Sequence, residues 1–246
     1  SLQKHLKGAM GTAGATFVRF AFGIPFAFAY LFLLNRVGGF PLPLAGGEFL
    51  FWVIVAASAQ IIAQALLIHL FSFRNFVVGS AYSRTEPVQA AIFGLIILGE
   101  RVNLYTIAAI VVAAMGVILI SVSRTRFSPA ELLTSVFSRT AGIGLLSATF
   151  FGVSAVSYRA AALSLGGPGF LMQAAFTLCV AIVFQTAILA VWMYWREPEE
   201  FARVAAAWKI SAIVGFVGAT ASFGWFAAFT LQSAALVKTV AQVEML

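Results

Sequence analysis

Charged residues lie inside apolar runs that are long enough to cross a membrane. Arg84 and Glu86 fall near the start of the run at 76–101, and Lys238 falls in the last apolar run of the chain. Hydrocarbon offers no water to solvate a charge, so charged residues at membrane depth pair with one another or face a polar cavity. These residue types therefore indicate either structural ion pairs or the binding of a charged solute.

The structural interpretation places the ion pairs between helices. On a regular helix Glu86 lies about 200° away from Arg84, so these two residues cannot pair with each other. Arg84 would then pair with an acid on another helix, such as Glu244. Glu86 would be the partner of Arg19 or Lys238. Long basic side chains can also extend along the helix and reach the headgroups.

The functional interpretation assigns the same charges to transport. Arg84 and Lys238 would bind an anionic or zwitterionic substrate. Glu86 would carry a proton, because burial of a carboxyl group favours its neutral form. Both interpretations stay open at the level of the sequence.

Polar and aromatic residues on neighbouring runs complete the candidate site. Gln60 and Gln64 lie one helical turn apart on one face, where they would line a polar cavity or join two helices by hydrogen bonds. Tyr82 and Trp225 would line the same cavity or simply pack. The predicted substrate-binding residues are Arg84, Glu86, Lys238, Gln242, Gln60, Gln64, Tyr82 and Trp225.

The composition excludes a water-soluble globule. Hydrophobic residues make up 62% of the chain and charged residues only 9%, whereas about a quarter of a soluble domain is charged. Helix-length apolar runs predict an all-α, polytopic helical membrane bundle. The excess of fifteen Lys and Arg over eight acids is interpreted as loop charge that sets topology, with no nucleic-acid partner.

Few residues are suited to metal binding or covalent catalysis. All eight acids are Glu, and the chain has two His and one Cys, which are scattered along the sequence. A zinc site, a Cys–His nucleophile pair or a disulfide framework is therefore unsupported. We expect no catalytic residue, no metal and no cofactor.

The pattern predicts seven complete spans, at 12–34, 49–71, 76–101, 105–122, 141–163, 170–195 and 210–230. Pro25 should kink the first of them. The basic segment Ser1 to Gly11 is interpreted as the exit of an earlier helix, and the segment that holds Lys238 as a truncated one. We expect ten spans in the intact protein, with the first and last helices largely or wholly missing from this chain.

A weak internal repeat organises these spans. At an offset of 154 residues, the segment at 81–85 matches the segment at 235–239, where a basic residue followed by Thr closes both. An odd number of spans in each repeat inverts the second copy, which is a pattern of secondary transporters. We predict two inverted five-helix repeats at 1–122 and 140–246, with a linker at 123–139.

Short motifs in both halves resemble EamA-type transporters of the drug/metabolite transporter superfamily. The first half carries Gly79-Ser80-Ala81, Pro87 and a closing Gly99-Glu100; the second carries Gln232-Ser233-Ala234-Ala235 and Gln242-Val243-Glu244. The resemblance implies a ten-helix inner-membrane carrier of two inverted halves that commonly exports metabolites or amino acids. It also implies cytoplasmic termini, whereas the loop charges would place both termini outside.

The sequence thus predicts a multi-pass protein of the inner (plasma) membrane that moves small metabolites by alternating access. Efflux of amino-acid-like or other small polar or anionic compounds is the expected activity, with a proton or sodium as coupling ion and a monomer or homodimer as the working form. The alternatives are an intramembrane lipid-modifying enzyme and a non-transporting membrane scaffold.

Overall fold

The computed structural model describes residues 10–70, 73, 76–101, 104–123, 138–167 and 169–245. Within these residues, all the regular secondary structure is helical. Five stretches are long and apolar enough to cross a membrane: Ala13–Arg36, Gly47–Leu70, Arg139–Ser164, Phe170–Arg196 and Trp208–Leu231. The predicted all-α, polytopic helical fold is confirmed, because each stretch exceeds the roughly 20 residues that a bilayer requires.

The chain forms two compact units, and the first consists of Ser1–Ala57 and Ala161–Leu231. Its helices are α2 (Thr12–Ala21), α3 (Ile24–Arg36), the first part of α4 (Gly47–Leu70), the end of α9 (Arg139–Ser164), α10 (Phe170–Arg196), α11 (Glu200–Ala206) and α12 (Trp208–Leu231). Helix α10 packs against α2, α3 and α12. Helix α3 also packs against α12, where the ring of Phe26 lies edge-on to that of Phe216.

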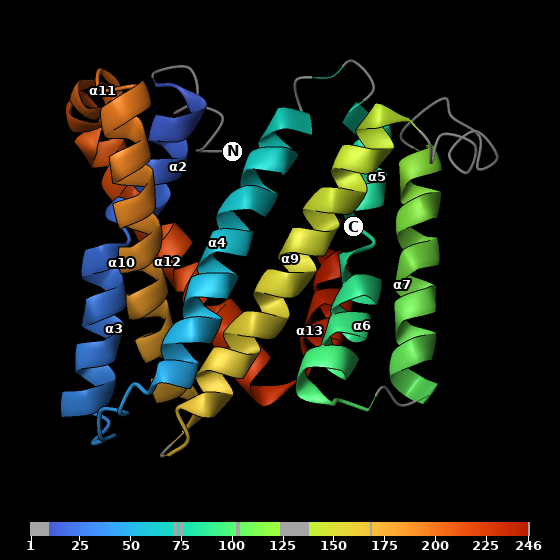
Figure 1. The fold of residues 1–246 in the computed structure, drawn as a ribbon, viewed down its shortest axis with the longest axis horizontal. Coiled ribbons are helices and arrows are strands. Elements are labelled where there is room, and N and C mark those ends of the chain that lie inside the picture. The colour runs from blue at the N-terminus through green and yellow to red at the C-terminus, as the bar shows by residue number, and fades with distance from the viewer. Residues whose placement is uncertain are drawn as a thin grey trace. The chain divides into compact units, whose positions relative to one another are not determined.

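The second unit consists of Ser58–Ala160 and Gln232–Leu246. Besides the remaining parts of α4 and α9, it contains α5 (Phe76–Ser83), α6 (Glu86–Leu98), α7 (Leu104–Ser123), α13 (Ala234–Val240) and the 3₁₀ helix η2 (Ala241–Met245). Helix α13 packs against both α6 and α7 (Figure 1). The segment that carries Lys238 therefore lies beside the segment that carries Glu86.

Each unit draws on both of the predicted repeats, since each combines an early and a late part of the chain. The repeat boundaries at 1–122 and 140–246, and the inverted relation between the repeats, stay predictions. Most of the predicted linker at 123–139 lies outside the described residues.

Two apolar runs are interrupted, each four residues before a proline. Pro25 and Pro87 both stand at the second position of a helix, in α3 and α6. A proline cannot donate to the carbonyl four residues earlier, and its ring clashes with that carbonyl. The carbonyls concerned belong to Ala21 and Ser83, which are the last residues of α2 and α5.

The kink predicted at Pro25 is therefore confirmed, but the prediction of one continuous helix over 76–101 is wrong. Arg84 and Thr85 form the break between α5 and α6, and the amide groups of both donate to carbonyls three residues earlier at 3.1 Å. These two bonds have the spacing of a 3₁₀ turn, so the chain passes from α5 to α6 through one such turn. Interrupted helices are typical of the solute sites of secondary transporters.

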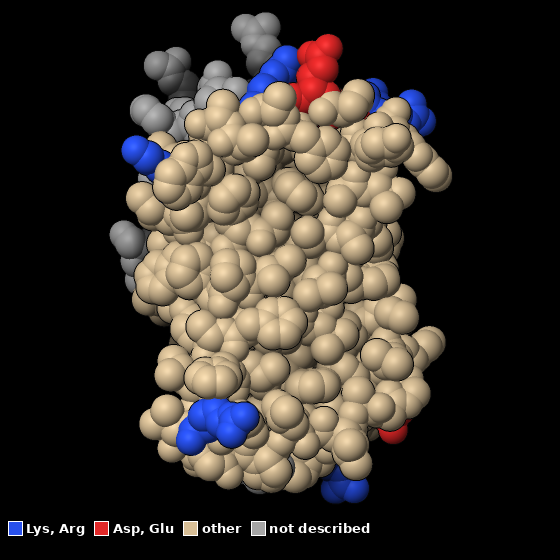
Figure 2. All heavy atoms as spheres, turned by 90° about the vertical axis from the view of Figure 1, so that its left-hand side faces the viewer, with Lys and Arg blue, Asp and Glu red and all other residues tan. Residues whose placement is uncertain are grey.

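The distribution of charge on the surface agrees with a membrane setting. On the face shown in Figure 2, charged side chains gather at the two ends, and the described residues between them are uncharged. Large apolar side chains are exposed on several helices, including Phe32 at 61% and Ile96 at 73%. In a bilayer these side chains would face lipid rather than water.

Small residues allow α9 and α5 to approach backbone to backbone. A Cβ atom on Gly144 would collide with the backbone of Gly79, and one on Gly79 would collide with Leu70 and the carbonyl of Thr140. Nearby, the Ser147 hydroxyl donates to the carbonyl of Ala63 in α4 at 3.0 Å. Helix α9 is thus held within the second unit by close van der Waals packing and interhelical hydrogen bonds.

We predict that Gly144→Ala will destabilise the second unit, whereas Gly142→Ala will not. The new methyl group at position 144 must push two backbones apart, at a cost of about 1–3 kcal/mol. Gly142 lies on the same helix with no atom within 4 Å of its added Cβ, so alanine there only improves helix propensity. Melting temperatures of the detergent-purified variants measure the difference, and equal values would contradict the close approach.

Candidate functional site

The first turn of α6 presents three polar side chains. Thr85 is the N-cap, Glu86 lies in the first turn, and Gln89 follows one turn later. The Gln89 amide donates to the Thr85 hydroxyl at 3.0 Å, and the Thr149 hydroxyl of α9 donates to the Gln89 amide oxygen at 2.6 Å. The break at Pro87 therefore creates a polar patch between α6 and α9, in a unit whose other helix faces are mostly apolar.

Lys238 of α13 reaches this patch and pairs with Glu86. The distance from Lys238 Nζ to Glu86 Oε1 is 2.7 Å, and the two side chains are only 17% and 14% exposed. The ammonium group also lies 5.7 Å from the ring centroid of Phe151 in α9, within the range of a cation–π contact. One of the partners predicted for Glu86 is thus confirmed, whereas Glu244 has no described side chain with which to test its pairing.

The helix ends favour this arrangement of charges. Glu86 lies in the first turn of α6, where the partial positive charge of the helix stabilises a carboxylate. Lys238 lies in the last turn of α13, where the partial negative charge stabilises an ammonium group. Two short helices thereby supply part of the solvation that water would give to the pair outside a membrane.

Two acceptor oxygens near the ends of these helices can accept further hydrogen bonds. Glu86 Oε1 contacts the Lys238 ammonium group at 2.7 Å, and a carboxylate can accept several more hydrogen bonds than this one partner supplies. Gln242 Oε1, four residues after Lys238, is buried with no donor from the described residues. Buried acceptors without donors are costly, so the arrangement favours a ligand that brings donors.

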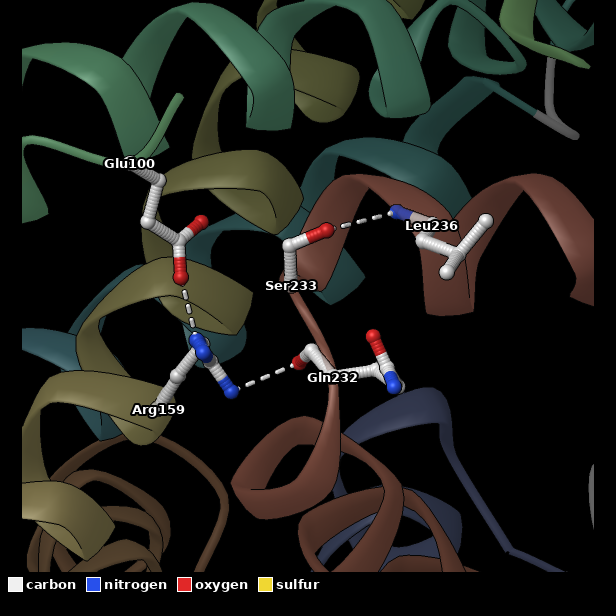
Figure 3. A network of polar contacts seen from close by, with 5 residues as sticks. All are labelled: Glu100, Arg159, Gln232, Ser233 and Leu236. Atoms are coloured by element: carbon white, nitrogen blue, oxygen red, sulfur yellow. Dashed lines mark hydrogen bonds and ion pairs between the residues drawn. The ribbon is translucent and has the colours of Figure 1, made fainter. Parts of the chain in front are cut away.

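A second ion pair lies at the other end of α6. The helix ends at Leu98, and Gly99 adopts the left-handed conformation at φ 63°, as expected for a C-terminal cap. The Glu100 carboxylate then pairs with the guanidinium of Arg159 in α9. Arg159 Nη1 also donates to the main-chain carbonyl of Gln232 at 2.8 Å, just before α13 (Figure 3).

The sequence predicted that Glu100 ends its helix, and the structure confirms this. Its burial against Arg159 was not predicted, because the two residues are 59 positions apart and no local pattern connects them. Both side chains are less than a fifth exposed. Glu100 is therefore a largely buried charge that pairs with another helix.

The remaining predicted site residues are distributed over both units. Gln60 accepts a hydrogen bond from the Tyr158 hydroxyl at 2.9 Å, so it joins α4 to α9. Tyr82 packs against the cluster of Val78 and Ala141. Gln64 is half-buried on α4. Trp225 belongs to α12 of the first unit, where its ring lies 5.6 Å from that of Phe229.

The second unit thus brings together Glu86, Lys238 and the polar side chains of Thr85, Gln89 and Thr149. The last three were not predicted. The sequence signal for Gln89 was available, since it lies three residues after Glu86 and shares its helix face. Whether any of these residues binds a substrate stays a prediction.

The first unit contains a buried carboxylate that sequence reasoning missed. Glu200 is only 3% exposed, although it stands among three acids in a short polar segment. Its Oε2 accepts a hydrogen bond from the amide of Gly11 at 2.8 Å, and its Oε1 pairs with Arg203 Nη1 at 2.6 Å. Gly11 is the N-cap of α2, so Glu200 supplies the capping acceptor that the local sequence lacks. The segment forms the short helix α11.

A polar pocket of about 420 Å³ borders this cap. It is lined by Gly11, Arg196, Arg203 and the four residues at 197–200, and none of the predicted site residues is among them. Arg203 in this lining pairs with Glu199 and Glu200. The pocket is therefore a feature of the helix cap and is separate from the predicted site.

The fold and the charge pair define a class of protein. Apolar spanning helices, interrupted runs and a charge pair at one interruption are features of multi-pass membrane proteins that carry solutes. Residues 2–122 match the model of the EamA-like transporter family. This match is consistent with a membrane transporter of the EamA type in the drug/metabolite transporter superfamily, the resemblance that the sequence motifs indicated. No curated protein matches the chain.

We predict that Glu200→Gln will lower the melting temperature, whereas Glu199→Gln will have little effect. The first change removes the charge at the start of α2, together with the close pair to Arg203, at a cost of about 1–2 kcal/mol. Glu199 is a matched control, because it also contacts Arg203 but its side chain is 85% exposed. Thermal unfolding in detergent measures both variants. A Glu200→Gln protein as stable as the control would show that the cap contributes nothing.

Proposed function

We propose that this transporter moves amino-acid-like solutes, or other small polar or anionic compounds, out of the cell across the inner membrane by alternating access. The observation that carries the proposal is the buried pair of Lys238 and Glu86 at the break between α5 and α6. A solute with a carboxylate and an ammonium group would present the complementary charge to each partner. The carboxylate would approach Lys238, and the ammonium group would approach Glu86.

The unsatisfied acceptors support a zwitterion over a simple anion. Gln242 Oε1 is a buried acceptor at which no described donor is directed, and the Glu86 carboxylate can accept more hydrogen bonds than Lys238 alone supplies. An ammonium group carries three donors and would satisfy acceptors of this kind. A simple anion would occupy Lys238 alone and leave the charge of Glu86 without compensation.

The pair also suggests how transport would be coupled to an ion. When an anionic solute without an ammonium group neutralises Lys238, the Glu86 carboxylate loses its partner in a medium of low dielectric constant. An isolated buried carboxylate is strongly disfavoured unless it binds a cation or a proton. A proton or sodium ion would fill this role, and Arg84, two residues from Glu86, would contribute to the local potential.

We predict that Lys238→Ala and Glu86→Gln will each reduce transport at least tenfold. Each change leaves one charge of the pair without its partner and removes a group that would contact the solute, and one charged contact is worth about 1.5–3 kcal/mol. The assay is uptake of a mixture of radiolabelled L-amino acids into proteoliposomes that contain the purified protein. Lys209→Ala is the matched control, because Lys209 is exposed at the start of α12.

An exchange of the two charges separates a structural pair from a solute-binding one. In the double variant Glu86→Lys with Lys238→Glu, the ion pair is restored with opposite polarity. A purely structural pair would recover both melting temperature and uptake. A pair that binds solute would recover the melting temperature alone, since each charge now faces a solute group of the same sign. Normal uptake in the single variants would overturn the proposed site, and lipid turnover or absence of any flux would favour the enzyme or scaffold alternative.

A further inference from the structure

Helices α6 and α13 are held to each other at both ends. At the start of α6, Glu86 pairs with Lys238 in the last turn of α13. Beyond the end of α6, Glu100 pairs with Arg159, which in turn binds the Gln232 carbonyl before the start of α13. The beginning of one helix therefore lies toward the end of the other, and the two helices pack in an antiparallel sense.

The lengths of the two helices give the second contact a role. The thirteen residues of α6 rise about 20 Å, whereas the seven residues of α13 rise about 10 Å. The apolar contacts of α13 with α6 and α7 leave it some freedom to slide along α6, because hydrophobic contacts have little directionality. A fixed bond near Gln232 removes this freedom.

Arg159 is chemically suited to fix that point. Its Nε faces Glu100, and its Nη1 faces the Gln232 carbonyl (Figure 3). The guanidinium group is planar, so the directions of its donors are set relative to one another. Lysine carries the same charge on a flexible stem and cannot hold the two acceptors in one fixed geometry.

The cap of α13 begins directly after this contact. Ser233 Oγ accepts from the Leu236 amide at 3.4 Å (Figure 3). Ser233 is thus the N-cap of α13 and directly follows Gln232. Lys238 follows two residues after Leu236 in the same short helix. A displacement of the Gln232 carbonyl would therefore pass along α13 to the Lys238 ammonium group.

We infer that Arg159 and Glu100 are positioning residues that set the place of α13 along α6, and thereby hold Lys238 opposite Glu86 for solute binding. The inference rests on the proposed function of the Lys238–Glu86 pair. Arg159 acts on the solute through the position of Lys238. Glu100 acts through Arg159, since its carboxylate fixes the guanidinium group that binds the Gln232 carbonyl.

The first test is the transport kinetics of Arg159→Lys and Glu100→Gln in proteoliposomes, with the radiolabelled L-amino acid mixture as probe. We expect the KM for uptake to rise about tenfold, as for the loss of one charge-assisted hydrogen bond, with the melting temperature of Arg159→Lys close to that of the unaltered protein. Arg101→Gln is the control, because Arg101 adjoins Glu100 but is exposed. An unaltered KM in both variants overturns the inference.

The second test is the exchanged pair Glu100→Arg with Arg159→Glu. A carboxylate at position 159 can pair with an arginine at position 100 but cannot donate to the Gln232 carbonyl. Positioning through that carbonyl predicts a restored melting temperature with a KM that stays raised, whereas full recovery of the KM shows that the pair only stabilises the fold. Failure of the inference stays distinct from failure of the proposed function, because only the latter gives normal uptake in Lys238→Ala.

Discussion

The organisation of the second unit depends on how one ammonium group and one carboxylate are compensated inside an apolar helical protein. The attraction between Lys238 and Glu86 at 2.7 Å must offset the loss of hydration of both ions, and such a pair is near neutral in net stability. Removal of either partner is costly, because it leaves the other charge buried and alone. A pair that adds little stability yet cannot be broken singly is well suited to a site at which a solute exchanges contacts with both members.

Proline placement determines where such a site can form. Pro25 and Pro87 each end the preceding helix four residues upstream, but only the second break has an acidic residue in the first turn of the helix that follows. At Pro87 the break also yields a new helix start, whose partial positive charge stabilises Glu86. The same short helix ends at Gly99 and directs Glu100 toward Arg159, so both ion pairs of this region depend on the bounds of α6.

Sequence reasoning reached the features that follow from local chemistry. The kink at Pro25, the helix end at Gly99-Glu100 and the glycine turn before α10, where Gly166 and Gly167 have positive φ, are all set by neighbouring residues. The end of α5 at Ser83 was also within reach, since the same proline rule predicts it. Partners distant in sequence could not be predicted. In the sequence, Arg159 is a residue near the end of a span, and Glu200 is one of three acids in a short polar segment. Only the packing of separate helices shows that these two carboxylate contacts are buried.

The most direct test of the central claim is the access of water and solute to the region around Lys238. Cys179 is the one cysteine in the chain, so Cys179→Ala gives a background in which a new thiol at Gln242→Cys can be followed alone, with Ile96→Cys as a lipid-facing control. The account predicts that a charged, water-soluble thiol reagent labels position 242 but not position 96, and that L-amino acids slow the labelling only while Lys238 is present. Equal resistance to labelling at both positions, with no effect of solute, would contradict a solute site beside the Lys238–Glu86 pair.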